Sequence, residues 1–189
     1  PHFLLRRQRQ MCIRDRISPE TFIIDYEDLN TEQINASMQA KKDMVPVLGK
    51  DWMIVTANSY ASAAGAEILE EGGTAADAMI AAQAVLGLVE PESSGLGGGS
   101  FLIWYDNKTN KVTTLDGRET APRASYATQF LNESGETKKF FDAVIGGLSV
   151  GTPGTPALMF KAHEKWGKTK WSSLFTAAIN LGGKWFSRI

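Results

Sequence analysis

Cysteine and histidine are scarce in this sequence. The chain has one cysteine, Cys12, and two histidines, His2 and His163, among its 189 residues. A single cysteine excludes an internal disulfide and any multi-cysteine metal site. The two histidines are also too far apart in sequence to suggest a pair of ligands, so we expect no metal site.

Long apolar runs and a strong net charge are also missing. The longest apolar stretch, residues 75–89, is interrupted by Asp77, Gln83 and Gly87, and no run approaches the roughly 20 residues that a membrane helix needs. The chain is 43% hydrophobic and 22% charged, with a formal net charge of −1. This composition is typical of one ordinary globular domain and favours neither nucleic acid nor an anionic membrane as a partner.

The arginines are distributed unevenly. Residues 1–16 contain five of the eight arginines and no lysine, whereas residues 17–189 contain three arginines and twelve lysines. A basic arm that binds nucleic acid is one interpretation. The interpretation we favour is a non-native segment, because RRQRQMCIRDR resembles a translated adaptor artefact. The start also lacks the pattern of a standard secretion signal. Residues 17–50 are polar and are expected to form a leader or linker, with a helix over 30–42.

Periodicity predicts a strand followed by two helices. Residues 52–58, WMIVTAN, are rich in β-branched residues and predict a buried strand. The next segment has helical spacing and ends at Gly72-Gly73. Thr74 and Asp77 then form an N-terminal capping signature for a second helix, which is apolar on almost every face and should be central. Pro91 places its end near residue 89.

The second half of the chain predicts a hairpin and further helices. Residues 101–106 and 111–116 are two β-rich runs joined by a short polar turn, and they are apolar enough that both faces of the sheet should be covered. Residues 123–147 predict a loop with a short helix. A helix should begin near Thr155-Pro156, and another amphipathic helix should cover residues 171–181.

Two glycine-containing segments imitate nucleotide-binding loops. GLGGGS at residues 95–100 ends in Ser100 instead of the third glycine, and it opens a strand where a dinucleotide loop opens a helix. GKT at 167–169 lacks the required upstream glycine, because Ala162 stands there. We therefore expect close backbone approach at the first segment and no phosphate site at either. His163 is expected to be solvated or partly packed.

Arg118 stands out by its setting in LDGRETAP, residues 115–122. It follows an expected strand, beside Gly117. Its planar guanidinium can hold a carboxylate through two parallel hydrogen bonds, which a lysine cannot do. Spacing alone leaves two interpretations: a carboxylate-binding residue, or the commoner local ion pair with Asp116 or Glu119.

Several longer segments resemble one known family. These are residues 57–106, LDGRETAP, FFDAVIGGLSVGTPGTPALM and HEKWGKTKWSSLFTAAI. They resemble the large-subunit region of γ-glutamyltranspeptidases, in the family's order and across about residues 44–181. Residues 51–181 are accordingly expected to form part of the large-subunit domain.

The resemblance implies a fold and a reaction. The expected fold class is α+β, as part of the αββα sandwich of an N-terminal-nucleophile hydrolase, incomplete in this chain. In this family an autoproteolytic zymogen exposes a threonine at the start of a small subunit. That threonine attacks the γ-glutamyl amide of glutathione or a related compound, with its α-amine as base and backbone donors for the oxyanion. The glutamyl group then passes to water or to an amino-acid or peptide acceptor, without metal or organic cofactor.

The same resemblance assigns a role to Arg118. The arginine of this motif grips the α-carboxylate of the γ-glutamyl group, so Arg118 is the expected substrate-binding residue. The catalytic threonine belongs to the small subunit, so we expect no catalytic residue here and no activity of this chain by itself. Family members commonly face the periplasm or the exterior, and this is the expected location.

The last residues depart from the family pattern. The family usually continues with a segment like ENGFPVS, whereas residues 182–189 are GGKWFSRI. One choice of synonymous codons for this end yields Glu-Asn-Gly-Phe-Pro-Val when a single base is skipped. We therefore expect residues 182–189 to be frameshifted, a hypothesis that the encoding DNA would decide.

Two alternatives to the transpeptidase remain open from sequence. One is a related acylase of the same superfamily, of the cephalosporin or poly-γ-glutamate type. The other is a non-catalytic domain that retains the carboxylate-binding arginine. A self-cleavage threonine downstream would favour either enzyme over the binding domain.

Overall fold

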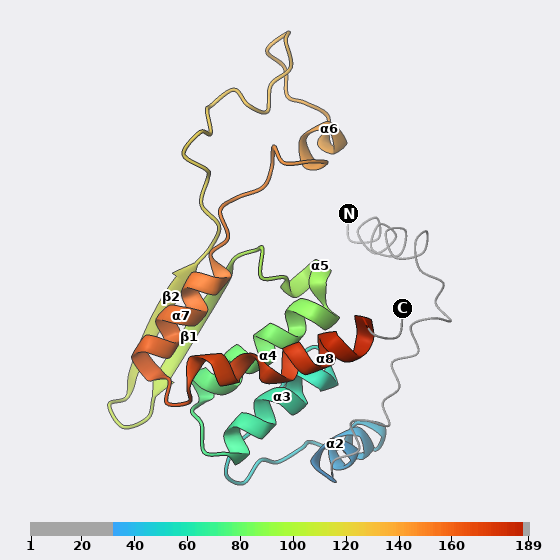
Figure 1. Ribbon diagram of the computed structural model, residues 1–189, viewed down its shortest axis with the longest axis vertical. Coiled ribbons are helices and arrows are strands. Elements are labelled where there is room, and N and C mark those ends of the chain that lie inside the picture. The colour runs from blue at the N-terminus through green and yellow to red at the C-terminus, as the bar shows by residue number, and fades with distance from the viewer. Residues whose placement is uncertain (1–31, 187–189) are drawn as a thin grey trace. The chain divides into compact units, whose positions relative to one another are not determined.

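A computed structural model describes residues 32–186 of the chain, with side chains described through residue 183 (Figure 1). The expected non-native segment 1–16, the first part of the expected leader and residues 187–189 lie outside the described residues. The chain divides into two compact units, Pro1–Val47 and Leu48–Ile189. In the first unit, helix α2 (Glu32–Lys42) confirms the helix expected there, with an acidic first turn and a basic last turn that suit the helix dipole.

Two helices at the start of the second unit pack closely against each other. Helix α3 (Ser59–Glu70) begins at Asn58, whose side chain accepts the N–H of Tyr60 at 3.0 Å. Helix α4 (Ala75–Val89) begins at Thr74 with the expected capping box. Small side chains on facing surfaces let the two backbones approach: a buried cluster unites Ala61, Ala64, Ala82 and Val85. These findings confirm both predicted helices and the central, buried position of α4, which also contacts the short helix α5 (Pro91–Ser94) and three helical elements later in the chain.

Strands β1 (Ser100–Asp106) and β2 (Lys111–Gly117) form the expected antiparallel hairpin, with Ser100 opposite Gly117 and Asp106 opposite Lys111. The Asp106 carboxylate organises the turn by accepting the Thr109 hydroxyl at 2.8 Å and the Lys108 N–H at 2.9 Å. The Thr109 hydroxyl first, and then the Lys108 N–H, lower the pKa of Asp106 below its ordinary value.

Helix α7 (Thr155–Trp166) covers one face of this hairpin. Trp166 stacks on Trp104 of β1, with 4.6 Å between ring centroids and 8° between the planes. The other face carries Phe101, Ile103 and Tyr105, which are 65%, 76% and 55% exposed. The expectation that both faces are covered is therefore wrong for the described chain, because its packed helix lies on one side only.

The predicted strand at residues 52–58 is absent. Residues 52–56 have no regular secondary structure, and burial alternates along them, with Ile54 partly buried and Val55 82% exposed. A strand needs a neighbour for its N–H and C=O groups, and within residues 32–186 the hydrogen-bonded sheet contains only β1 and β2. The prediction of a strand here is therefore wrong, because β-branched residues favour a strand but do not supply a neighbouring strand to pair with.

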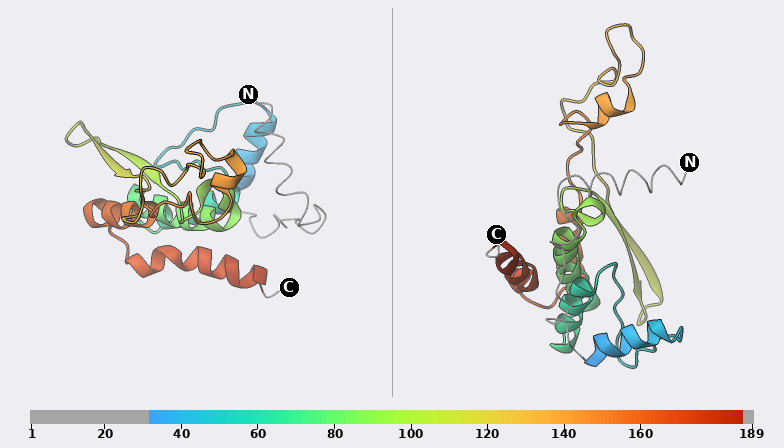
Figure 2. Two further views of the ribbon diagram at one scale, coloured as in Figure 1. Left: turned by 90° about the horizontal axis from the view of Figure 1, so that it is seen from above. Right: turned by 90° about the vertical axis from the view of Figure 1, so that its right-hand side faces the viewer.

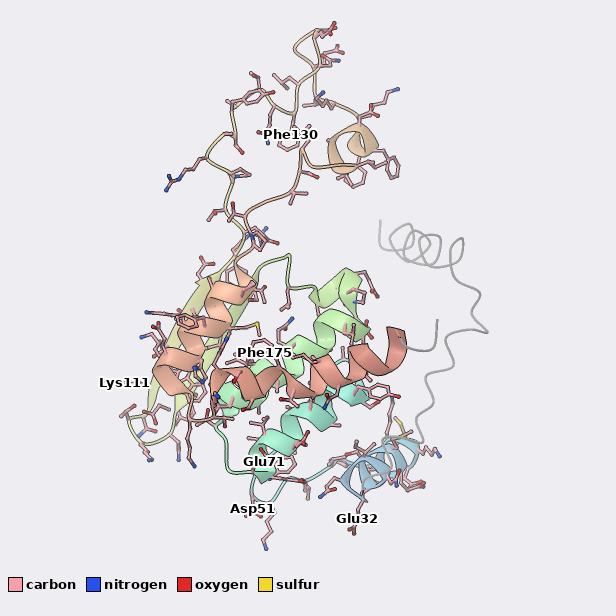
Figure 3. The ribbon with its side chains drawn as sticks, in the orientation of Figure 1. Glu32, Asp51, Glu71, Lys111, Phe130 and Phe175 are labelled. Carbon is pink, nitrogen blue, oxygen red and sulfur yellow. The ribbon has the colours of Figure 1, made fainter. Side chains whose placement is uncertain are left out.

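Residues 118–154 leave the hairpin as a long excursion and return to α7. Thr120 and Thr152 close its base through reciprocal backbone hydrogen bonds of 3.3 and 2.8 Å. The expected short helix is α6 (Phe140–Val144). The excursion extends beyond the end of the hairpin, and Phe130 lies within it (Figure 3).

The C-terminal helix differs in form from its prediction. Residues 171–175 are a 3-10 turn, η3 (Trp171–Phe175), and the α-helix α8 follows over Thr176–Phe186. Helix α8 packs on α4, on the side away from the hairpin (Figure 2). Two buried clusters result, one of them around Ile80, Met159 and Leu174. Among the described residues, no helix has the length and apolar character to cross a membrane.

A buried carboxylate joins the start of α4 to the loop that follows α7. Asp77 is 0% exposed. Its Oδ2 accepts the N–H and hydroxyl of Thr74, both at 3.0 Å, and the N–H groups of Lys168 and Thr169 at 3.0 and 3.1 Å. Burial raises the pKa of Asp77, but these hydrogen bonds to the ionised form outweigh it and hold the pKa below its ordinary value.

This carboxylate predicts how stability depends on pH. Because the folded pKa is lowered, the unfolded chain binds the proton first as pH falls. The stabilisation is complete above the unfolded pKa of about 4 and is lost as pH falls through that value towards the folded pKa. We expect Asp77→Asn to reduce the free energy of unfolding at neutral pH by about 1–3 kcal/mol and to flatten its fall between about pH 5 and 3.

Urea unfolding of the 189-residue chain at several pH values checks this expectation. The exposed Asp142 in α6 provides the matched control, because Asp142→Asn removes the same charge from a site outside the core. A stability curve of Asp77→Asn that runs parallel to the wild-type curve would contradict the assigned role of the carboxylate.

Candidate functional site

The candidate site is the turn at Arg118, where the chain leaves β2. The Arg118 N–H donates to the Asp116 carboxylate at 2.9 Å, which is the geometry of an Asx turn. Asp116 is therefore engaged with the backbone of the turn. Glu119 lies next to Gly98 and Gly99 of the glycine-rich segment. The turn is thus held by its own flanking residues.

The glycine-rich segment fastens the start of α7. The Gly98 carbonyl accepts the N–H groups of Gly154 and Thr155, both at 3.1 Å. Helix α7 has no side-chain cap, and this carbonyl satisfies N–H groups at the positive end of the helix dipole. The expected close backbone approach is confirmed, and the glycines lead into strand β1, unlike those of a dinucleotide loop.

Three glycines make room for the backbone around Arg118. A Cβ on Gly117 would lie 2.6 Å from Cβ of Leu158 in α7. A Cβ on Gly154 would overlap the Gly117 carbonyl and lie 2.7 Å from the Arg118 carbonyl oxygen, and one on Gly151 would lie 2.8 Å from Cβ of Glu119. These approaches are closer than real Cβ atoms make, so β2, the excursion and α7 meet at Arg118 only because side chains are absent.

The Arg118 side chain is exposed. Within residues 32–183, Lys161 forms an ion pair with Glu164 and the His163 ring lies near Asp77, and neither contact includes Arg118. The local ion pair that spacing favoured is therefore not formed with Asp116 or Glu119. The exposed guanidinium, which has no ion-pair partner, can donate two parallel hydrogen bonds to a carboxylate ligand.

Sequence reasoning missed the hydroxyl of Ser100. Its Oγ is buried and has no hydrogen-bond partner among the described residues, and Ser100 lies opposite Gly117 in the hairpin. The alternation along β1 places Ser100 on the same face as Trp104, which packs on α7. That alternation was readable in the sequence, but the helix that buries this face was not.

His163 is partly packed, as expected. Its Nε2 lies 2.7 Å from the Thr169 carbonyl oxygen and 3.8 Å from Asp77 Oδ1, and its ring meets Trp171 edge to face. Backbone N–H groups of the GKT segment, at Lys168 and Thr169, donate to Asp77. The backbone N–H groups that a phosphate-binding loop would offer to its ligand are bonded to Asp77 at these two residues. In the described part of the chain, no group of three or more His, Cys, Asp or Glu residues could hold a metal ion.

Comparison with known proteins identifies the family. The family model for γ-glutamyltranspeptidase matches residues 61–187. The glutathione hydrolase proenzyme of Bacillus subtilis is 42% identical over 139 residues, which cover 74% of this chain and 24% of that protein. The chain therefore spans about a quarter of the length of this curated relative.

Solved structures give the same result. The γ-glutamyltranspeptidase of Helicobacter pylori is 34% identical with a TM-score of 0.68, and the match covers 72% of this chain and 39% of that one. The enzyme from Pseudomonas nitroreducens, complexed with L-DON, is 37% identical with a TM-score of 0.66 and covers 70% and 39%. The fold is α+β, part of the N-terminal-nucleophile hydrolase domain. The chain belongs to the γ-glutamyltranspeptidase family.

Proposed function

We propose that this chain is part of the large-subunit region of an enzyme that cleaves the γ-glutamyl amide of glutathione and related compounds. The glutamyl group passes to water or to an amino-acid or peptide acceptor. Family membership supports this reaction class. The observation that carries the proposal is the exposed and unpaired guanidinium of Arg118 on a turn fastened by glycine contacts.

Arg118 binds the α-carboxylate of the γ-glutamyl donor in this proposal. A guanidinium offers two parallel N–H groups that match the two carboxylate oxygens. The Asp116 carboxylate accepts a hydrogen bond from the backbone N–H of Arg118 and so stabilises the turn. The backbone that carries the guanidinium is therefore fixed before the donor arrives, and only the side chain has to be ordered on binding.

The nucleophile comes from elsewhere in the precursor. An N-terminal threonine of the small subunit attacks the γ-carbonyl, which lies at the other end of the glutamyl group from the carboxylate that Arg118 holds. The role of this chain is thus recognition and orientation, which contribute to the rate by fixing the reacting carbonyl near the nucleophile. The small subunit of the same precursor is the necessary protein partner.

The 189-residue chain by itself should release no product from a chromogenic γ-glutamyl anilide, because it lacks the proposed nucleophile. The measurement is the absorbance of the released aniline, with the longer precursor as the positive control. Turnover by the purified chain above the background rate would contradict this division of roles.

Arg118→Lys in the longer precursor should weaken donor binding, because lysine presents a point charge and loses one of two parallel contacts. We expect a loss of about 1.5–3 kcal/mol, which is roughly a tenfold to hundredfold rise in the KM for the donor. Steady-state kinetics with the anilide measure it.

Arg123→Lys is the matched control for this substitution, because Arg123 is also exposed but lies in the excursion, beyond the closed turn. It should leave the donor KM unchanged. If Arg118→Lys leaves both KM and kcat unchanged, the carboxylate-binding role is wrong. A non-catalytic domain would bind donor without turnover in the precursor. An acylase of the cephalosporin type would turn over the side-chain amide of a cephalosporin better than the γ-glutamyl anilide.

Gly154→Ala should disturb the same site from the side of α7. The added methyl group would overlap the carbonyl of Gly117 and approach that of Arg118, and such overpacking costs about 1–3 kcal/mol. We expect a lower melting temperature of the 189-residue chain and a higher donor KM in the precursor.

Gly147→Ala is the control for this effect, because a Cβ at Gly147 meets no atom within 4 Å. Equal melting temperatures for the two glycine variants would show that the contacts around Gly154 do not restrict the turn.

A further inference from the structure

Helix α7 is anchored at both ends by backbone hydrogen bonds to other parts of the fold. At its start, Gly154 and Thr155 donate to the Gly98 carbonyl. After its end, the N–H groups of Lys168 and Thr169 donate to the buried carboxylate of Asp77. The anchors belong to distant parts of the sequence, so the position of α7 depends on both.

The second anchor is reinforced by the helix itself. His163, in the last turn of α7, has Nε2 2.7 Å from the Thr169 carbonyl oxygen. The Gly167 N–H donates to the His163 carbonyl at 2.8 Å. These contacts hold the loop that binds Asp77 against α7. A substitution at Asp77 that moves the loop is therefore expected to move the helix as well.

The body of α7 is packed along its length. Leu158, Met159 and Ala162 are 5%, 2% and 0% exposed, and Trp166 stacks on Trp104. A helix of 12 residues is about 18 Å long at 1.5 Å per residue. Because packed helices shift as units and not by continuous deformation, a displacement at the Asp77 end reaches the Gly154 end.

The Gly154 end of α7 lies against the backbone of Arg118. Leu158 occupies the space beside Gly117, and Gly154 lies against the carbonyls of Gly117 and Arg118. A shift of α7 therefore moves the turn that carries the guanidinium. A misplacement of about 1 Å caused far from the reacting atoms can cost up to a hundredfold in rate.

We propose that Asp77 is a positioning residue for the Arg118 site, acting through its hydrogen bonds to the loop after α7 and through α7 itself. This inference rests on the proposed role of Arg118 in donor binding. Asp77 touches no substrate in it; the carboxylate fixes where α7 lies, and α7 fixes the direction of the Arg118 turn.

The competing explanation is that Asp77 only caps α4. Thr74 separates the two, because its hydroxyl takes part in the cap but does not contact the loop after α7. Thr74→Ala weakens the cap and leaves Asp77 bonded to Lys168 and Thr169. Asp77→Asn weakens both the cap and the long-range anchor, because a neutral amide oxygen accepts weaker hydrogen bonds than an ionised carboxylate.

The test compares two donors in the longer precursor: a γ-glutamyl anilide and the 4-aminobutyryl anilide, which is the same acyl group without the α-carboxylate. The ratio of their kcat/KM values measures recognition of the carboxylate. Loss of folded enzyme lowers both values alike and leaves the ratio unchanged. We expect Asp77→Asn to lower the ratio by roughly threefold to tenfold and Thr74→Ala to leave it within twofold.

Two further variants make the outcome decisive. Arg118→Lys should lower the ratio more than Asp77→Asn, and an unchanged ratio in Arg118→Lys would overturn the proposed function together with this inference. His163→Phe removes the bond to Thr169 but keeps a ring against Trp171, and it should lower the ratio in the same direction. If Arg118→Lys lowers the ratio but Asp77→Asn and His163→Phe do not, the positioning role alone is overturned. If Asp77→Asn does not fold, His163→Phe decides.

Discussion

The described fold depends on one buried carboxylate. Asp77 lies in the first turn of α4, the helix against which α3, α7, α8 and η3 pack, and its carboxylate also binds the loop between α7 and η3. A buried ion is costly unless hydrogen bonds replace its water, and here donors from Thr74, Lys168 and Thr169 do so. The local helix cap and the long-range closure of the fold therefore share one charge.

Glycines, which have no side chain, determine the geometry of the candidate site. Gly117 and Gly154 let β2 and α7 meet at distances that any Cβ would prevent, and Gly98 gives its carbonyl to the start of α7. The glycine-rich segment that imitates a nucleotide loop is thus a structural joint beside Arg118. The backbone of the turn is fixed, while the guanidinium of Arg118 forms no local ion pair. The turn therefore presents a charged group that is free to bind a ligand.

The family assignment and the geometry contribute different parts of the functional conclusion. The family match supports the proposed reaction class, γ-glutamyl transfer, which no motif in this chain could indicate by spacing alone. The geometry adds that Asp116 is committed to the backbone and that Arg118 is unpaired. Together they support the proposal that this segment recognises the donor and that another part of the precursor supplies the covalent chemistry.

Local pattern was sufficient for most elements and for the identity of the candidate residue. Helices α3 and α4, the capping box at Thr74 and the hairpin follow from short-range hydrogen bonding and side-chain periodicity, which are written in neighbouring residues. The residue type of Arg118 and its place after a strand were likewise visible in the sequence. The tertiary structure decided four other features: the absence of a strand at 52–58, the uncovered face of β1, the buried hydroxyl of Ser100, and the hydrogen bonds that Asp77 accepts from residues some 91 positions away. Each depends on which distant segment supplies a partner or withholds one, and that is a property of packing in space, not of the order of residues along the chain.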